Sequence, residues 1–171
     1  MRQIVLSLLC ISISLFSVGQ APVNDECSGA LAVTPSPNTN PGTSVVSNNT
    51  GATQSMTGCF GTVQNDVWFK FTATSTRHRI NITTDNNISP VIQVFGGACG
   101  SLQSLGCFTV GTDGVYNLVN VNLVNLTTGA TYYYRTYGPS NNIGTNISTF
   151  VTTLPTDAKL IIIALLNRIT G

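Results

Sequence analysis

The sequence contains few charged side chains. Only 8% of its 171 residues are Asp, Glu, Lys or Arg, against about 25% in an average soluble protein. Seven basic and six acidic residues leave a net charge of +1. The basic residues form no long cluster that could neutralise a phosphate backbone. We therefore expect no nucleic acid partner.

Histidine is also scarce, and this argues against an enzyme. The single histidine, His78, lies between Arg77 and Arg79 and is predicted to be a solvated residue at the end of a strand. Neither a Gly-x-Ser-x-Gly nor a His-Glu-x-x-His motif is present. The carboxylates are too few to favour the paired acids of a glycosidase. We expect a non-catalytic protein.

No apolar run is long enough to cross a bilayer comfortably. The run 4–16 follows Met1 and Arg2 and precedes the small residues Ser17 and Gly19, a pattern typical of a secretory signal peptide. Lipid attachment at Cys10 is disfavoured because Leu9 precedes it. We predict a signal peptide over 1–19, a secreted or cell-surface location, and no transmembrane segment after its removal.

Removal of the leader leaves four cysteines, an even number that predicts two disulfides in an exported chain. Cys99 and Cys107 enclose a glycine-rich segment, so we expect them to pair with each other. Cys27 and Cys59 would then join the N-terminal segment to the loop before the first long strand. A metal site is the weaker alternative, because the chain has no Cys-x-x-Cys spacing.

Polar and apolar residues alternate with period two from Asp66 onward, which predicts half-buried strands. Two weaker strands precede them, and glycine, proline, serine and asparagine turns connect the segments. The strands are expected at 66–74, Ile80–Ile82, Val91–Phe95, two stretches within Val115–Leu126, Thr131–Tyr137 and Thr145–Thr153, and more weakly near Ala30–Val33 and Thr43–Val46. About eight antiparallel strands favour an all-β sandwich of jelly-roll type.

The same alternation predicts an outward-facing aromatic surface. If Tyr132 and Tyr134 point into the core, their neighbours on the strand and one tryptophan point away from it. The predicted ligand-contact residues are Trp68, Tyr133, Arg135 and Tyr137. Aromatic rings stack on sugars, and Tyr and Arg are common interface anchors. The alternative is a second covered face that would bury these residues without any ligand.

Both flanks of the alternating region differ from it. The segment Val33–Met56 is rich in proline, asparagine and threonine and is expected to be a long excursion at the edge of a sheet. The sandwich is predicted to span residues 20–154. The apolar tail, residues 155–171, is either a terminal element packed on the sandwich or a stretch foreign to it, from a truncated or frame-shifted reading frame.

Four sequence blocks resemble one module family. They are Ala21–Ala30, which contains Asn-Asp-Glu-Cys, then Asn65–Phe71, Pro90–Leu102 and Gly129–Arg135. This set resembles the repeated "NDEC" β-sandwich module in surface proteins of bacteria that use type IX secretion. That module is similar to the bacterial pre-peptidase C-terminal domain, which accompanies secreted proteases and includes collagen-binding modules. The resemblance covers about residues 21–153.

The resemblance also implies a function and a metal. Related modules hold calcium at positions that match Asn24, Asp25 and Asp66 here, so calcium is the expected ion; the alternative is that these residues cap turns. The expected function is a secreted, non-catalytic binding or adhesion module for an extracellular glycan or matrix protein. The alternatives are an accessory fragment of a secreted protease or glycoside hydrolase, and a structural spacer of a multi-module surface protein.

Overall fold

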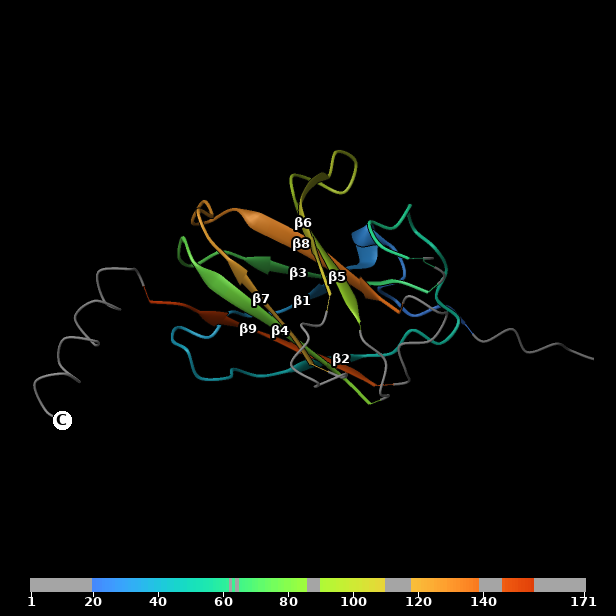
Figure 1. The fold of residues 1–171 in the computed structure, drawn as a ribbon, viewed down its shortest axis with the longest axis horizontal. Helices are drawn as coiled ribbons and strands as arrows, with labels where there is room; N and C mark the ends of the chain where they lie inside the picture. Colours follow the sequence, from blue (N-terminus) through green and yellow to red (C-terminus); the bar gives the residue numbers. More distant parts are fainter. Residues whose placement is uncertain are drawn as a thin grey trace, which may run out of the picture.

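Two β-sheets pack face to face in the computed structural model of the chain (Figure 1). The structure describes residues 20–61, 63, 65–85, 90–109, 118–138 and 146–155. These residues form nine strands and one short 3₁₀ turn, η1 (Cys27–Gly29), with no α-helix. The predicted signal peptide and all of the predicted tail beyond Pro155 lie outside the described residues.

The strand order is that of a jelly roll. One sheet has the order β1 (Leu31–Ala32), β3 (Val67–Thr72), β8 (Thr131–Tyr137), β5 (Val91–Gly96), β6 (Gln103–Phe108). The other has the order β2 (Val45–Ser47), β9 (Ile147–Thr153), β4 (His78–Thr84), β7 (Leu118–Leu123). All neighbours are antiparallel except β1, which runs parallel to β3 at the sheet edge. The predicted all-β jelly-roll sandwich is confirmed.

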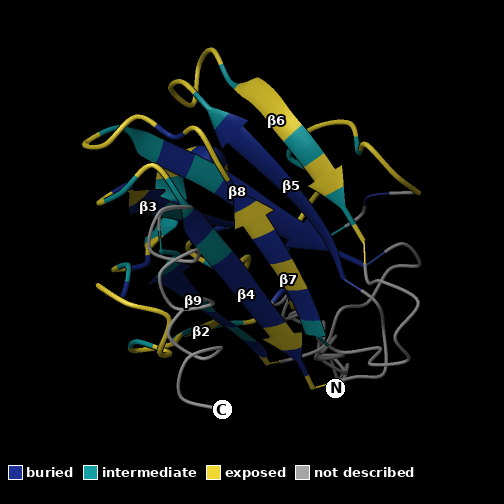
Figure 2. Cartoon of the chain, turned by 60° about the vertical axis from the view of Figure 1, so that its left-hand side comes forward, coloured by how far each residue is buried: buried dark blue, intermediate teal, exposed yellow. Residues whose placement is uncertain are grey.

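The core lies between the sheets, and the period-two pattern selects the residues that enter it. Val67, Phe69 and Phe71 of β3 are buried in the main cluster, as are Ile80 and Ile82 of β4. Tyr132 and Tyr134 also point inward, as the alternation predicts. Dark blue bands on β4, β5 and β8 in Figure 2 mark this buried interior.

The cysteine pairing differs from the expectation. The bonds are Cys27–Cys99 and Cys59–Cys107, so the number of disulfides was right and the predicted partners were wrong. The segment between Cys99 and Cys107 is not a simple glycine-rich turn, because strand β6 occupies most of it. An extended strand advances about 3.4 Å per residue, and this separates the two cysteines too far for a bond. Cys99 instead bonds to Cys27 in η1, and Cys107 bonds to Cys59. Both partners belong to segments that lie over the five-stranded sheet.

Candidate functional site

The outer face of the five-stranded sheet is covered over most of its length. Trp68, Arg135 and Tyr137 are at most 1% exposed. Turn η1 packs beside Trp68 and Phe95, in a cluster that includes Cys27 and Ala30. Residues 52–61, here called the strap, cover Arg135 and Tyr137 through contacts from Met56 to Phe60. The outward side of these strands is therefore a second buried layer.

Arg135 anchors the strap through a fully buried guanidinium. Its Nη1 donates to Asp66 Oδ2 at 3.0 Å and to the Met56 carbonyl oxygen at 2.9 Å. Its Nη2 donates to the Thr57 carbonyl oxygen at 2.6 Å and to Gln93 Oε1 at 2.8 Å. Oxygen acceptors from three separate parts of the chain thus surround the cation. Charge-assisted bonds of this kind are about twice as strong as neutral ones.

Aromatic rings flank the same guanidinium. Its Cζ lies 5.7 Å from the centroid of the Trp68 ring and 5.2 Å from that of Tyr137. Both distances lie within the cation–π range of about 6 Å. The rings exclude water from the Asp66–Arg135 ion pair, in which both side chains are 0% exposed. No atom of the pair is open to a ligand, so the pair belongs to the buried packing beneath the strap.

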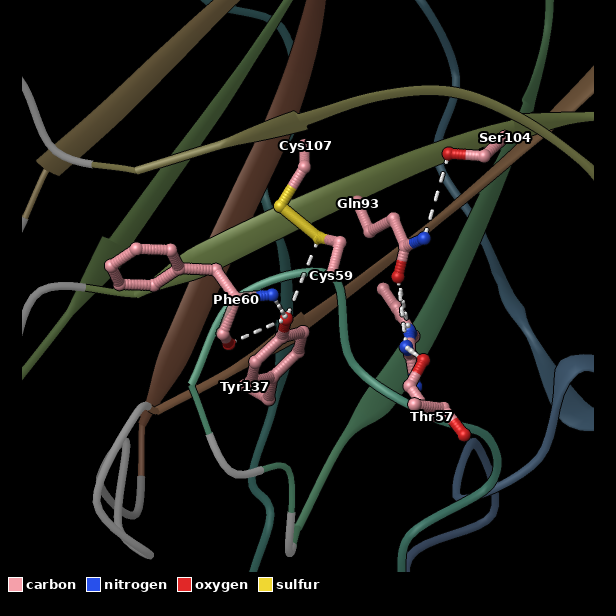
Figure 3. The surroundings of a disulfide bond; sticks show 8 residues. Thr57, Cys59, Phe60, Gln93, Ser104, Cys107 and Tyr137 are labelled. Atoms are coloured by element: carbon pink, nitrogen blue, oxygen red, sulfur yellow. Dashed lines mark hydrogen bonds between the residues drawn. A yellow bond between two sulfur atoms is a disulfide. The ribbon is translucent and has the colours of Figure 1, made fainter.

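The far end of the strap is fixed at Tyr137 and at a disulfide (Figure 3). The Phe60 backbone N–H donates to the Tyr137 hydroxyl oxygen at 3.1 Å, and that hydroxyl donates to the Phe60 carbonyl oxygen at 3.0 Å. Cys59 bonds to Cys107 on β6. Gly58 is required here, because a Cβ at this position would lie 2.2 Å from Val63 Cγ2.

The predicted contact face is therefore corrected. Trp68, Arg135 and Tyr137 do lie on the side of the sheet away from the core, but the strap and η1 bury them. Only Tyr133 remains half-exposed. The outer side of β3 and β8 is therefore a second covered face, which was the alternative expectation from the sequence. Sequence reasoning missed the strap because its segment has no alternating pattern and contributes mainly backbone groups and small polar side chains.

The three predicted calcium ligands lie near one another but bind protein donors. Asn24 Oδ1 accepts from Ser47 Oγ at 2.9 Å. Asp25 Oδ1 accepts from the Thr53 backbone N–H at 2.6 Å. Asp66 accepts from the backbone N–H and the hydroxyl of Ser55 in addition to Arg135.

The side-chain oxygens of Asn24, Asp25 and Asp66, in the folded arrangement, do not fit a calcium site. Calcium takes six to eight oxygen ligands, and the oxygens of Asn24, Asp25 and Asp66 already accept bonds from the protein. Among the described residues, no group of three or more His, Cys, Asp or Glu side chains could hold a metal. The bonds match the turn-capping alternative, and calcium stays a prediction.

His78 is buried rather than solvated, which corrects a further expectation. Its Nε2 accepts from the backbone N–H groups of Thr74 and Ser75, both at 3.1 Å. Its Nδ1 faces the Thr152 carbonyl oxygen at 3.1 Å, so the neutral tautomer with the proton on Nδ1 satisfies every partner. Desolvation lowers the pKa of His78, while the bond to Thr152 opposes that shift.

This burial predicts a pH-dependent stability. The folded pKa is below the ordinary value of about 6.5, so the unfolded chain binds the extra proton first as the pH falls. The free energy of unfolding should therefore be constant above about pH 6.5 and decrease below it, by at most about 1.4 kcal/mol per pH unit. Urea unfolding between pH 8 and pH 5 measures this slope. A His78→Gln variant should lose it, and an unchanged slope in that variant would contradict the assignment.

One part of the outer face remains open. Beyond the edge of the covered region, β1, β3 and β8 line a groove of about 410 Å³. Lys70 lies directly opposite Tyr133 across β3 and β8, and Thr72 lies opposite Thr131. All four residues line the groove. Its volume lies within the range of about 300–1,000 Å³ that is typical of small-molecule sites.

Lys70 gives the groove its charge. The side chain is half-buried, and within the described ranges no carboxylate pairs with it. The Tyr133 side chain, also half-buried, supplies an apolar surface on the strand opposite Lys70, and the threonines supply hydroxyls. This arrangement can stack on a sugar ring and bind its hydroxyl or acidic groups. The described residues that line the groove include no Asp, Glu, His, Cys or Ser.

The fold and the groove define a class: small jelly-roll domains, braced by disulfides, that present a ligand-sized hollow on one sheet. A family model described as "Galactose binding domain-like", from a set associated with type IX secretion, matches residues 23–151. The chain belongs to this family. The match confirms the resemblance to modules of type IX secretion proteins. A search of curated proteins found no match.

Solved structures that resemble the chain include the following two. One is the pre-peptidase C-terminal domain of collagenase from Bacillus anthracis, with 14% identity and a TM-score of 0.43, covering 71% of this chain and 95% of that one. Another is CorA, described as a surface-associated copper-binding protein of Methylomicrobium album BG8, with 10% identity and a TM-score of 0.43, covering 72% and 98%. Within the described ranges, no helix has the length and hydrophobicity to span a membrane.

Proposed function

We propose that the protein is a non-catalytic extracellular module that binds carbohydrate in the groove between β1, β3 and β8. The observation that carries this proposal is the pairing of Lys70 with Tyr133 on the open part of an otherwise covered face. A half-exposed tyrosine on the strand opposite an unpaired lysine favours a glycan that carries acidic groups. The family, described as galactose-binding-like, supports a binding role.

The residues that could catalyse a reaction support the same conclusion. The single histidine has both ring nitrogens in hydrogen bonds within the fold. The Asp66 carboxylate is paired with the buried Arg135 guanidinium. Neither group can act as a general base without breaking the structure that holds it.

An extracellular or cell-surface location is supported by the family's association with type IX secretion and by two disulfides, which persist in oxidising compartments. We propose that residues 1–19 act as the signal peptide that directs this export. A role as an accessory domain or spacer within a larger surface protein is compatible with the same location.

A glycan array followed by calorimetry tests the groove. The Tyr133→Ala variant should weaken binding by about fivefold, because ring stacking contributes on the order of 1 kcal/mol. Lys70→Gln should weaken binding of acidic glycans more than that of neutral ones. Phe60→Ala is the matched control, since this ring is 58% exposed and lies outside the groove.

The proposal fails if the wild-type protein binds no glycan, or if Tyr133→Ala binds as well as the wild type. Binding to an immobilised matrix protein in the absence of glycan binding would instead identify a protein adhesin. Binding to neither would favour the spacer role.

A further inference from the structure

Strand β6 forms an open edge of the five-stranded sheet. It pairs with β5 on one side, and among the described residues no strand pairs with its other side. Figure 2 shows β6 as the outermost strand of its sheet, with exposed bands along its length. An open edge presents backbone N–H and C=O groups that can pair with another strand. The other sheet also ends on an edge strand, β7.

These two edge strands border an apolar hollow of about 270 Å³. Leu105 and Phe108 of β6 line it from one sheet, and Leu123 and Val124, where β7 ends, line it from the other. Leu105 is 50% exposed and Val124 is 49% exposed. The described part of the chain therefore leaves apolar side chains partly uncovered beside an edge that can accept a strand.

The sequence of β6 does little to prevent such pairing. Natural edge strands are protected by lysine, by proline or by a bulge. The residues Gln103–Phe108 include no charged residue and no proline. The ladder between β5 and β6 does contain a bulge, in which Leu105 has no residue directly opposite, and this side chain lines the hollow. None of the described residues that line the hollow is charged.

Both disulfides hold this edge in a fixed position. Cys107 of β6 bonds to Cys59 of the strap, and Cys99, a few residues before β6 begins, bonds to Cys27 of η1. A segment that is already ordered loses little conformational entropy when it binds a partner. The edge is therefore prepared for pairing before a partner arrives.

We propose that this surface, here called the β6 edge and defined by Gln103–Phe108 and Val124, pairs with the same surface of a second copy of the chain. Antiparallel pairing about a two-fold axis places β6 against β6 of the other copy, so any charged residue near the axis would meet its like. The β6 edge has no such residue. The net charge of the chain is only +1, so long-range repulsion between two copies is weak.

A two-fold axis near Leu105 extends the five-stranded sheet across both copies. Side chains on the same face of paired strands lie about 5 Å apart, so Leu105 of each copy covers the hollow of the other. The groove stays open in this arrangement, because it lies at β1, β3 and β8, and β1 is the edge opposite β6. Pairing at the β6 edge is therefore independent of ligand binding in the groove.

Sedimentation velocity of the purified protein at increasing concentration tests the proposal. A single strand pair with one apolar contact is a small interface, so the wild-type mass should rise from that of one chain to twice that value within several hundred micromolar. Leu105→Lys places two like charges near the axis and should weaken the dimer by about tenfold or more. Val46→Lys is the matched control, because Val46 is 60% exposed and lies on β2, an edge strand remote from β7 in the other sheet.

A charge swap locates the axis. Leu105→Glu should weaken the dimer as Leu105→Lys does, and an equimolar mixture of the two variants should restore it, because opposite charges then meet. This restoration also shows that both variants are folded. A wild-type protein that stays monomeric, a dimer that Leu105→Lys leaves intact, or a mixture that stays monomeric overturns the proposal. None of these results affects the groove, which Tyr133→Ala tests separately.

Discussion

Replacement of Arg135 by methionine is expected to lower the free energy of unfolding by about 3–5 kcal/mol, the usual cost of removing one partner of a buried ion pair. The change leaves the Asp66 carboxylate buried without its cation. It also removes the donors that bind the Met56 and Thr57 carbonyl oxygens of the strap. Guanidinium unfolding followed by tryptophan fluorescence measures the loss, because Trp68 packs against the site.

Two further variants identify the cause of that loss. Arg135→Met combined with Asp66→Asn removes both charges, and we expect it to lose less than the sum of the single variants, with a coupling of about 1–3 kcal/mol. Arg135→Lys keeps the charge but cannot reach Asp66, Gln93 and the strap together, so it should remain clearly destabilised. A loss below about 1 kcal/mol in Arg135→Met would contradict the structural role of the pair.

Removal of the Cys27–Cys99 disulfide, by Cys27→Ala with Cys99→Ala, is expected to cost about 4 kcal/mol. This bond spans 72 residues, and the chain-entropy model gives about 4 kcal/mol for a loop of this length. It also holds η1 over Trp68 and Phe95. Thermal unfolding should show the cost as a large decrease in Tm. A change of only a few tenths of a kcal/mol would show that η1 stays in place without the bond.

The pairing itself can be checked by peptide mapping without reduction. The expected cross-linked peptides contain Cys27 with Cys99 and Cys59 with Cys107. Removal of the second bond, which spans 48 residues, should cost a similar amount on the same model. The side chains of Tyr137 and Arg135 also donate hydrogen bonds to backbone carbonyl oxygens of the strap. Without the disulfide, the strap should therefore become more sensitive to proteolysis but stay attached to the sheet. A fragment joining Cys99 to Cys107 would contradict the structure.

The location of the proposed groove follows from where the chain covers its own surface. The strap and η1 occupy the middle of one sheet and leave the groove at Lys70 and Tyr133. On the other sheet, exposed amides remain along β7. The aromatic residues that look best suited to ligand binding in the sequence stabilise the fold instead. The polar residues that line the groove are instead threonines, one lysine and one tyrosine.

The sequence alone determined most of the strands, the sandwich and the number of disulfides, because these depend on local patterns and on simple counts. Two stretches were expected within Val115–Leu126, where the described residues form the single strand β7. The alternation in Val67–Thr72 assigns each side chain to one side of the sheet, and Thr131–Tyr137 was predicted with the bounds that the structure shows. Strand β6 was missed because Gly106 and the polar residues around it resemble a turn and give no alternation.

Only the tertiary structure decided which outward residues stay exposed. The bond from Arg135 to Thr57 joins residues 78 positions apart, and the bond from Tyr137 to Phe60 joins residues 77 apart. A period-two pattern assigns a side of the sheet but does not show whether a distant segment covers it. The same reason explains the burial of His78 against Thr152 and the exchange of cysteine partners. Each depends on contacts between segments that are brought together only by the packing of the two sheets.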